Sequence, residues 1–346
     1  MFITLILDAL ERFQGERGEA ALFHLLKGKK SAQTIQDVHT FHLEGFYGLF
    51  PGLQRDTYQE VLNRMFQNNF IQIQNDRLLI TKVGMDFLDV HKSDRERVKD
   101  FRDINMNKNL RIFLERLHLM IQMYSNLSIG NHKFTPITDH LPTQKWVKNY
   151  YLNHKSHLSE IMKQVYVHLY SILESLPHPM SDVFVLKLTG SHRVGLSMRQ
   201  LAKKYSFSTY DIELFLLWTC QIIWTRTTPS DILNTWFPQE KEGVLLTQSA
   251  QKTMEWYEKG YLMEEIASLR GYKLSTIQDH IVEMALSLMD FPLDSFLTNE
   301  EYHLIEEAIQ KTNSHRLRHI KEKCPETITY FQIRLTLAKV KGRREV

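Results

Sequence analysis

The sequence of 346 residues has little cysteine, proline or glycine: it holds two Cys, nine Pro and 14 Gly. Cys220 and Cys324 cannot build a four-cysteine zinc site, and so few cysteines exclude a disulfide-stabilised fold and fit a reducing compartment. Few glycines and prolines disfavour an architecture of many short strands and tight turns. The composition therefore predicts a mainly α-helical protein.

Long hydrophobic runs are also missing. The most apolar stretch, residues 212–224, contains Glu213 and Gln221 and is shorter than the about 20 residues that span a bilayer. Residues 1–13 place their apolar side chains on one helical face, without a basic leader or a small-residue cleavage site. We therefore expect a cytoplasmic protein that does not enter a membrane.

Neither sign of charge dominates the whole chain, whose formal net charge is +3. The bases are unevenly distributed, because residues 311–346 hold ten Lys or Arg and three Glu, which leaves 33 bases and 37 acids elsewhere. A basic end on a near-neutral body is typical of contact with a polyanion such as nucleic acid, and equally of a solvated charged terminus.

The order of expected elements divides the chain into several modules. Residues 1–90 predict helices followed by a short hairpin that turns at Asn75-Asp76, which is the order of a winged-helix module. Residues 91–178 predict a helical connecting region, and residues 179–246 a second helix-turn-helix-like module whose last helix is apolar on most faces. Residues 247–346 predict a helix-turn-helix domain with a basic end.

The Gly28-Lys29-Lys30-Ser31 segment has a partial likeness to a phosphate-binding loop. A P-loop requires G-x-x-x-x-G-K-[ST], and here Phe23 stands five residues before Gly28 while Lys30 separates Lys29 from Ser31. What remains is three lysines, Lys27, Lys29 and Lys30, beside a helix that Ser31 can cap. Such a group can bind a phosphate of DNA or form a solvated turn.

No other pattern indicates catalysis or a cofactor. Two histidine pairs with helical spacing, His39/His42 and His154/His157, lack a third ligand, and no nucleophile elbow occurs. Cys220 lies in an apolar segment, which is typical of an inert buried thiol. We therefore expect no enzymatic activity, no metal and no cofactor.

The C-terminal helix-turn-helix places apolar residues Leu274, Ile277, Ile281, Met284, Ala285 and Leu288 on one face of its third helix. The outer face is predicted to carry Ser275, Thr276, Gln278, Asp279, Glu283 and, in part, His280. Because Asp279 and Glu283 would repel phosphates, this helix either docks on a protein or enters a groove only by its first turn, around Lys273–Thr276. The later bases are then the better phosphate ligands: Arg316, Arg318, Lys321, Arg334, Lys341, Arg343 and Arg344.

Two separated motifs carry a resemblance to a known module. Residues 265–271 (EIASLRG) with 275–281 (STIQDHI), and later 328–335 (ITYFQIRL) after Pro325-Glu326, resemble the helicase-type helix-turn-helix domain at the C-terminus of some RecQ-type helicases. The whole chain resembles the YpbB type of bacterial protein, and residues 25–34 are similar to the start of the RecQ winged-helix domain. The resemblance implies a partnership with a RecQ-type helicase in DNA repair or recombination.

Together these patterns predict a non-catalytic, DNA-binding accessory protein. Two alternatives stay open: a protein–protein adaptor that uses its helix-turn-helix units as scaffold, and a sequence-specific transcriptional regulator. The sequence leaves the DNA form and the oligomeric state undetermined.

The incomplete phosphate loop leads to a testable prediction. We expect the purified chain to hydrolyse no ATP, because a catalytic P-loop needs both glycine positions and the Lys-Ser/Thr pair. ATP turnover measured by phosphate release checks this. Turnover that disappears in Lys29→Ala protein would contradict it.

Overall fold

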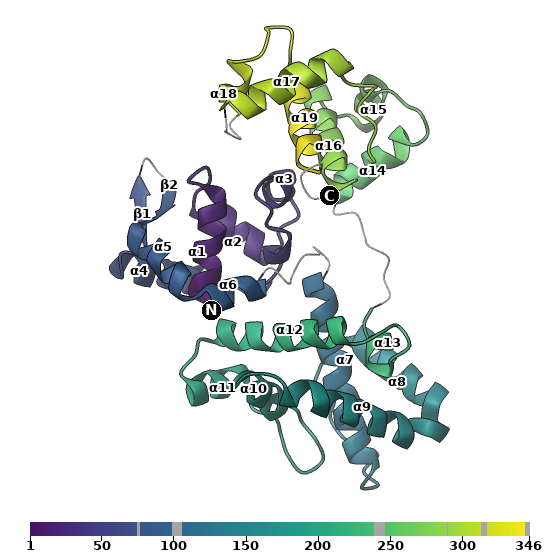
Figure 1. Ribbon diagram of the computed structural model, residues 1–346. Helices are drawn as coiled ribbons and strands as arrows, with labels where there is room; N and C mark the ends of the chain where they lie inside the picture. The colour runs from purple at the N-terminus through teal and green to yellow at the C-terminus, as the bar shows by residue number, and fades with distance from the viewer. Residues whose placement is uncertain (75–76, 99–105, 239–245, 289, 313–316, 343–346) are drawn as a thin grey trace. The chain divides into compact units, whose positions relative to one another are not determined.

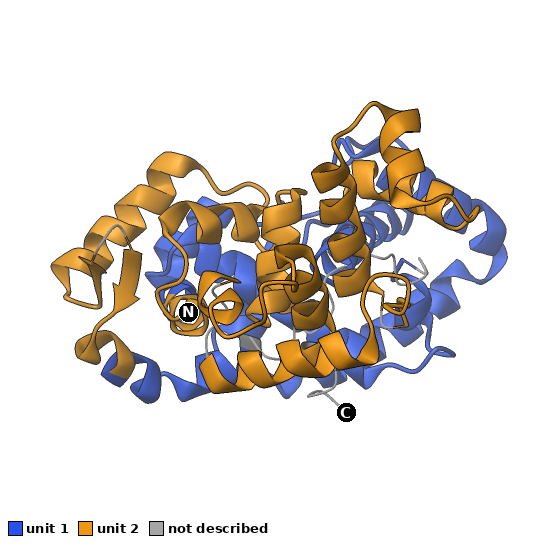
Figure 2. Ribbon diagram, turned by 90° about the horizontal axis from the view of Figure 1, so that it is seen from above, with its two compact units in different colours: residues 1–6, 86–242 blue, residues 7–85, 243–346 orange. Residues whose placement is uncertain are grey.

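The computed structural model describes residues 1–74, 77–98, 106–238, 246–288, 290–312 and 317–342 (Figure 1). Within these residues the fold is mainly helical with one two-stranded hairpin near the N-terminus, which confirms the predicted fold class. The chain forms two compact units (Figure 2). Unit 1 contains residues 1–6 and 86–242, and unit 2 contains residues 7–85 and 243–346.

The N-terminal segment has the helix–helix–helix–hairpin order that the sequence predicts. Helix α4 buries Tyr58, Leu62 and Met65, whereas Val61 and Phe66 are only half-buried. The strands pair antiparallel, with Ile71 opposite Ile80, and the expected turn at Asn75-Asp76 lies outside the described residues. The elements are α1 (Phe2–Phe13), α2 (Glu19–Lys27), α3 (Ala32–Thr40), the 3-10 helix η1 (Glu44–Phe46), α4 (Arg55–Gln67), β1 (Ile71–Gln74), β2 (Arg77–Ile80) and α5 (Lys82–Val90).

The C-terminal part of unit 2 is mainly helical over its described residues. Its core contains Ala250, Ile266, Ile277, Ile281 and Leu335. The predicted inward position of Leu274 is wrong: this side chain is 38% exposed, because the first turn of its helix extends beyond the core. The helices are α14 (Gln248–Tyr257), α15 (Met263–Arg270), α16 (Leu274–Ser287), α17 (Asn299–Thr312), α18 (Leu317–Lys321) and α19 (Tyr330–Gly342).

Unit 1 is built around α12, which packs against α7, α9, α10 and α11. Ser208 and Asp211 form a capping box at the start of α12, and the helix is buried on most faces, as its apolar sequence predicts. Pro177 and Pro179 lie between α9 and α10, inside this unit. Its helices are α6 (Lys92–Val98), α7 (Met106–Leu127), α8 (Leu141–His154), η2 (Lys155–His157), α9 (Leu158–Glu174), α10 (Met180–Lys187), α11 (Met198–Tyr205), α12 (Thr209–Arg226) and α13 (Ile232–Thr235).

Histidine 118 on α7 is a titratable group inside the core of unit 1. Its side chain is 6% exposed and lies edge-on to the Phe184 ring, with centroids 6.1 Å apart. Burial lowers the pKa of His118 to about 3, and the nearby Lys187 ammonium adds to the decrease. His118 is therefore neutral in the folded protein at physiological pH.

This burial predicts a pH-dependent stability. The unfolded chain takes up a proton on His118 below about pH 6.5 while the folded chain does not, so acidification favours unfolding. Between pH 7.5 and 5.0 we expect this group to reduce the free energy of unfolding by about 2 kcal/mol. Urea unfolding of wild-type and His118→Gln protein at both pH values measures the difference. Equal pH dependence in the two proteins would contradict the assignment.

Candidate nucleic-acid interface

Helix α16 stands where a helix-turn-helix places its DNA-recognition helix, but most of its surface is covered. It packs against α14, α15 and α19 of its own domain and against α3 of the N-terminal segment (Figure 1). Ile277 and all residues from 280 to 285 are buried. The buried middle of α16 therefore cannot enter a DNA groove, whereas its first turn is exposed.

Two residues assigned to the outer face of α16 are buried instead. His280 is 6% exposed and Glu283 is 2% exposed. The expectation that they face outward is wrong, because neighbouring helices cover α16 on more sides than the single apolar stripe indicates. His280 therefore contacts protein rather than base edges, and Glu283 does not present its charge to phosphates.

Glu283 stabilises the start of α14. Its carboxylate accepts hydrogen bonds from the backbone N–H of Thr247 and, at 3.2 Å, from the Thr247 hydroxyl, while that hydroxyl oxygen caps α14 by accepting from the Ala250 N–H at 3.1 Å. Burial raises the pKa of Glu283, and the two bonds from Thr247 oppose this rise. The carboxylate thus joins α16 to the start of α14, although Glu283 and Thr247 are 36 residues apart in the sequence.

His280 belongs to a second internal network. Its Nδ1 lies 2.7 Å from the hydroxyl oxygen of buried Thr253, and the Arg270 guanidinium donates to the same oxygen. Burial lowers the pKa of His280, and the Arg270 charge lowers it further. Arg270 also donates to the Ser249 carbonyl at 2.8 Å. Residues of α14, α15 and α16 meet in this network, which fastens the three helices together.

The charge of Asp279 is balanced within the domain. Its carboxylate forms an ion pair with Arg334 of α19, whose side chain is 19% exposed. Arg334 was predicted to bind DNA phosphates, and in the structure its guanidinium contacts this carboxylate. The pair offsets the charge of Asp279, whose side chain is 47% exposed, and engages a positive charge of the closing helix.

The first turn of α16 remains as an open, positively charged helix end. Gly271 adopts the left-handed conformation (φ 64°) that ends α15, and Lys273 begins α16 without a side-chain cap. Lys273 and Ser275 are exposed, while Thr276 and Gln278 are half-buried. Uncapped N–H groups and the helix dipole favour an anion at such an end.

The predicted N-terminal group forms a second exposed basic site. Lys29 and Lys30 are exposed, Lys27 lies with its ammonium 5.5 Å from the centroid of the Phe23 ring, and Ser31 caps α3 at the Thr34 N–H. Gly28 takes the left-handed conformation (φ 69°) at the end of α2. The segment is therefore a tight link between two helices.

Further titratable groups lie near this second site. Burial lowers the pKa of His24, and the cations Lys29, Arg55 and Lys27 lower it further. Arg55, which the sequence patterns did not single out, lies 2.5 Å from the carboxylate of Glu19.

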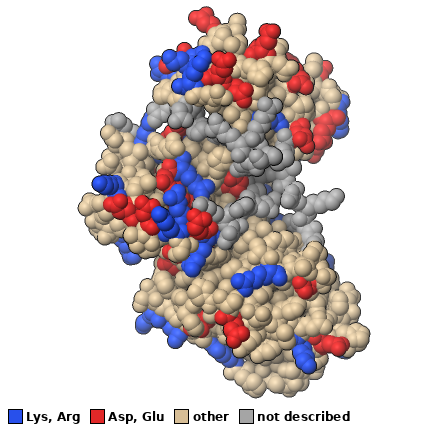
Figure 3. Space-filling model, viewed as in Figure 1, with Lys and Arg blue, Asp and Glu red and all other residues tan. Residues whose placement is uncertain are grey.

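The bases after residue 311 do not form one continuous positive surface among the described residues. Lys321 donates to the backbone carbonyls of Pro325 and Glu326 at 3.2 and 3.0 Å, and to that of Ile328, so it closes the loop before α19. Arg318 is exposed and pairs with Glu322 at 3.2 Å. On the face drawn in Figure 3, basic and acidic side chains are interspersed. Arg316, Arg343 and Arg344 lie outside the described residues, as does the side chain of Lys341.

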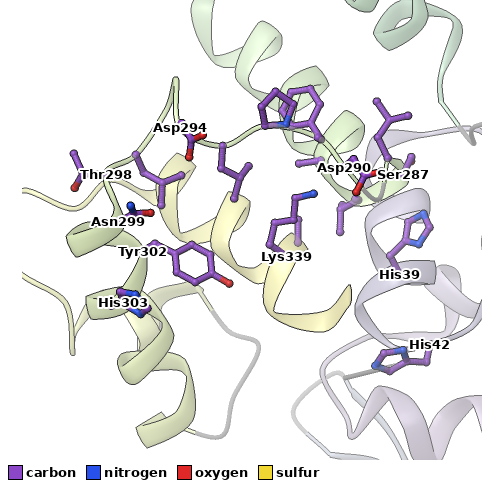
Figure 4. A pocket seen from close by; sticks show the side chains of 18 of the residues that line it. His39, His42, Ser287, Asp290, Asp294, Thr298, Asn299, Tyr302, His303 and Lys339 are labelled. Atoms are coloured by element: carbon purple, nitrogen blue, oxygen red, sulfur yellow. The ribbon is translucent and has the colours of Figure 1, made fainter. Parts of the chain in front are cut away.

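A cavity of about 720 Å³ lies within unit 2 (Figure 4). His39 and His42 come from α3 and its end, Tyr302 from α17 and Lys339 from α19, and the loop after α16 contributes Asp290. Burial lowers the pKa of Lys339, and the Asp290 carboxylate opposes this decrease. No group of three His, Cys, Asp or Glu among the described residues is arranged to hold a metal ion.

The cysteines have no catalytic arrangement among the described residues. Cys220 is buried in α12, and burial raises the pKa of its thiol. Burial also raises the pKa of Cys324.

No helix within the described ranges is long and apolar enough to cross a membrane.

Comparison with known proteins agrees with this geometry. A helix-turn-helix domain family matches residues 249–337, which are α14 to α19. Protein YpbB of Bacillus subtilis (strain 168) is 27% identical over 343 residues, covering 98% of this chain and 97% of that protein. The chain is a homologue of YpbB. The helix-turn-helix domain suggests DNA binding. No solved structure matches the chain.

The position of Glu283 leads to a prediction about stability. Glu283→Ala removes a buried carboxylate that accepts two hydrogen bonds, so we expect the free energy of unfolding of unit 2 to fall by about 1.5–3 kcal/mol. Glu264→Ala, an exposed change on α15, is the matched control and should change it by less than about 0.5 kcal/mol. Urea unfolding measures both. Equal effects of the two changes would contradict the role of Glu283.

Proposed function

We propose that this protein is a non-catalytic DNA-binding accessory factor that works with a RecQ-type helicase in DNA repair or recombination. The observation that carries the DNA-binding part is the uncapped first turn of α16, with Lys273 and Ser275 exposed while Ile277 and residues 280–285 are buried. A helix end of this kind contacts the sugar–phosphate backbone, which positions a protein on DNA without reading its sequence.

The burial of α16 by neighbouring helices argues against a sequence-specific regulator. Such a regulator inserts several side chains of its recognition helix into the major groove. Here Ile277, Ile281 and Ala285 face the core, and His280 and Glu283 are engaged by Thr253 and Thr247. The polar side chains near the open turn, Thr276 and Gln278, are half-buried, and the Asp279 carboxylate is paired with Arg334.

The helicase partnership is supported by the resemblance of residues 249–341 to a domain that some RecQ-type helicases carry themselves. The protein would supply the helicase with a DNA-contacting module. A pure adaptor would bind the helicase with equal affinity in the presence and absence of DNA. An affinity pull-down with a RecQ-type helicase, with and without forked DNA, separates these functions, because an accessory factor should be retained more strongly when the fork is present.

The open turn of α16 leads to a test of DNA binding. We expect Lys273→Ala/Ser275→Ala protein to bind forked and duplex DNA of any sequence less tightly, and its salt dependence to fall by about one counterion. Fluorescence anisotropy across a salt series measures both quantities. The matched control is Lys252→Ala/Ser268→Ala, which removes the same residue types from exposed positions on α14 and α15. Equal affinities of the double variant and the control would contradict the proposed contact.

Lys321 is a poor probe of DNA contact. Its ammonium donates to three carbonyls, so Lys321→Ala would disturb the loop before α19 whether or not DNA is bound. Arg318 tests the C-terminal bases more cleanly, because its side chain is 84% exposed.

A further inference from the structure

Unit 1 contains a stretch of the chain with bases and no acids. Between Asp182 and Asp211 there is no Asp or Glu, and five cations occur there: Lys187, Arg193, Arg199, Lys203 and Lys204. This stretch comprises the end of α10, the loop 188–197, α11 and the turn into α12. The rest of unit 1 is close to neutral, with 15 Lys or Arg and 16 Asp or Glu, so this stretch carries the positive charge of the unit.

The loop 188–197 is held in one conformation by hydrogen bonds. The Gly190 N–H donates to the Arg193 carbonyl at 2.8 Å, and the Leu196 N–H donates to the Leu186 carbonyl at 2.8 Å. The Ser191 N–H donates to the Ser125 hydroxyl at 2.8 Å, which ties the loop to α7. The loop therefore presents its tip in a fixed direction.

Gly195 shows how closely the two sides of this loop approach. A Cβ atom on Gly195 would lie 2.0 Å from the carbonyl oxygen of Lys187, so only glycine fits there. At the opposite side of the loop, His192, Arg193 and Val194 are exposed, and Val194 is 80% exposed. The loop has the shape of a short projecting wing with a cation at its tip.

Helix α11 continues the basic surface. Ser197 and Gln200 form a capping box at its start. Arg199 and Lys203 are four residues apart and therefore lie on one face, and Lys203 and Lys204 are exposed in the last turn. Across the described parts of the chain, no ion pair joins Arg193, Arg199, Lys203 or Lys204 to a carboxylate. Their charges are therefore available to an external ligand.

We infer that Arg193, Arg199, Lys203 and Lys204, here called the α11 basic surface, bind the phosphate backbone of DNA as a second contact site. Several like charges carried on a fixed loop and a short helix match a ligand with regularly spaced negative charges. Val194 is one apolar side chain at the tip, too little to anchor a membrane. This inference rests on the proposed DNA-binding function and adds a contact that the helix-turn-helix domain does not supply.

The test compares two triple variants of the full chain. Arg193→Ala/Arg199→Ala/Lys203→Ala removes three charges of the α11 basic surface. Lys145→Ala/Lys148→Ala/Lys163→Ala removes three exposed charges from α8 and α9 of the same unit and is the matched control. Anisotropy of fluorescein-labelled forked DNA is measured across a salt series, and circular dichroism melting must show equal stability of the two variants.

The first variant should bind DNA at least about tenfold more weakly at low salt, with a slope of log K against log salt that is about two to three counterions smaller. The control should bind like wild type. Equal affinities and slopes for both variants would overturn the proposal that the α11 basic surface binds DNA. So would loss of binding to phosphatidylserine vesicles with unchanged DNA binding, because the ligand would then be a membrane.

The variants also separate this inference from the proposed function. If wild-type protein binds DNA and Lys273→Ala/Ser275→Ala weakens it while the α11 variant does not, the proposed function stands and the inference fails. If only the α11 variant weakens binding, the α11 basic surface is the contact and the assignment to α16 fails. Absence of wild-type binding to any DNA would overturn both.

Discussion

The burial of helix α16 is the constraint on which the rest of unit 2 depends. Once α14, α15, α19 and α3 pack around it, every polar group along its middle must find a partner inside the protein. His280 finds Thr253, and Glu283 finds Thr247. The same burial leaves the first turn as the exposed part of α16, so the packing of the helix also decides which of its residues can meet a ligand.

Several basic side chains of the C-terminal domain contact groups within the domain itself. Arg334 neutralises Asp279, Arg270 joins Thr253 to the Ser249 carbonyl, and Lys321 closes the loop before α19. Each of these bases would count toward a positive surface in a sum over the sequence. In the structure they orient helices instead, because charge-assisted hydrogen bonds are short, strong and directional.

The cations assigned to DNA contact lie in separate places: Lys29 and Lys30 between α2 and α3, Lys273 at the start of α16, and the α11 basic surface in unit 1. None of these sites is large. Several small phosphate contacts on different elements give affinity that depends on salt and ignores sequence. Such binding does not depend on one preferred operator sequence.

The sequence alone determined the fold class, the hairpin and the helices of the C-terminal domain. These features depend on local rules, such as the apolar period of α4, the continuous apolar run of α12 and the glycine that ends α15. It also indicated that α16 could meet DNA by its first turn. Only the tertiary structure decided which groups Glu283 and Arg334 contact, because their partners lie 36 and 55 residues away in the sequence. A helical period shows which residues share a face but not how many faces other helices cover, so the burial of His280 and the free charges of α11 emerged only when the chain was folded.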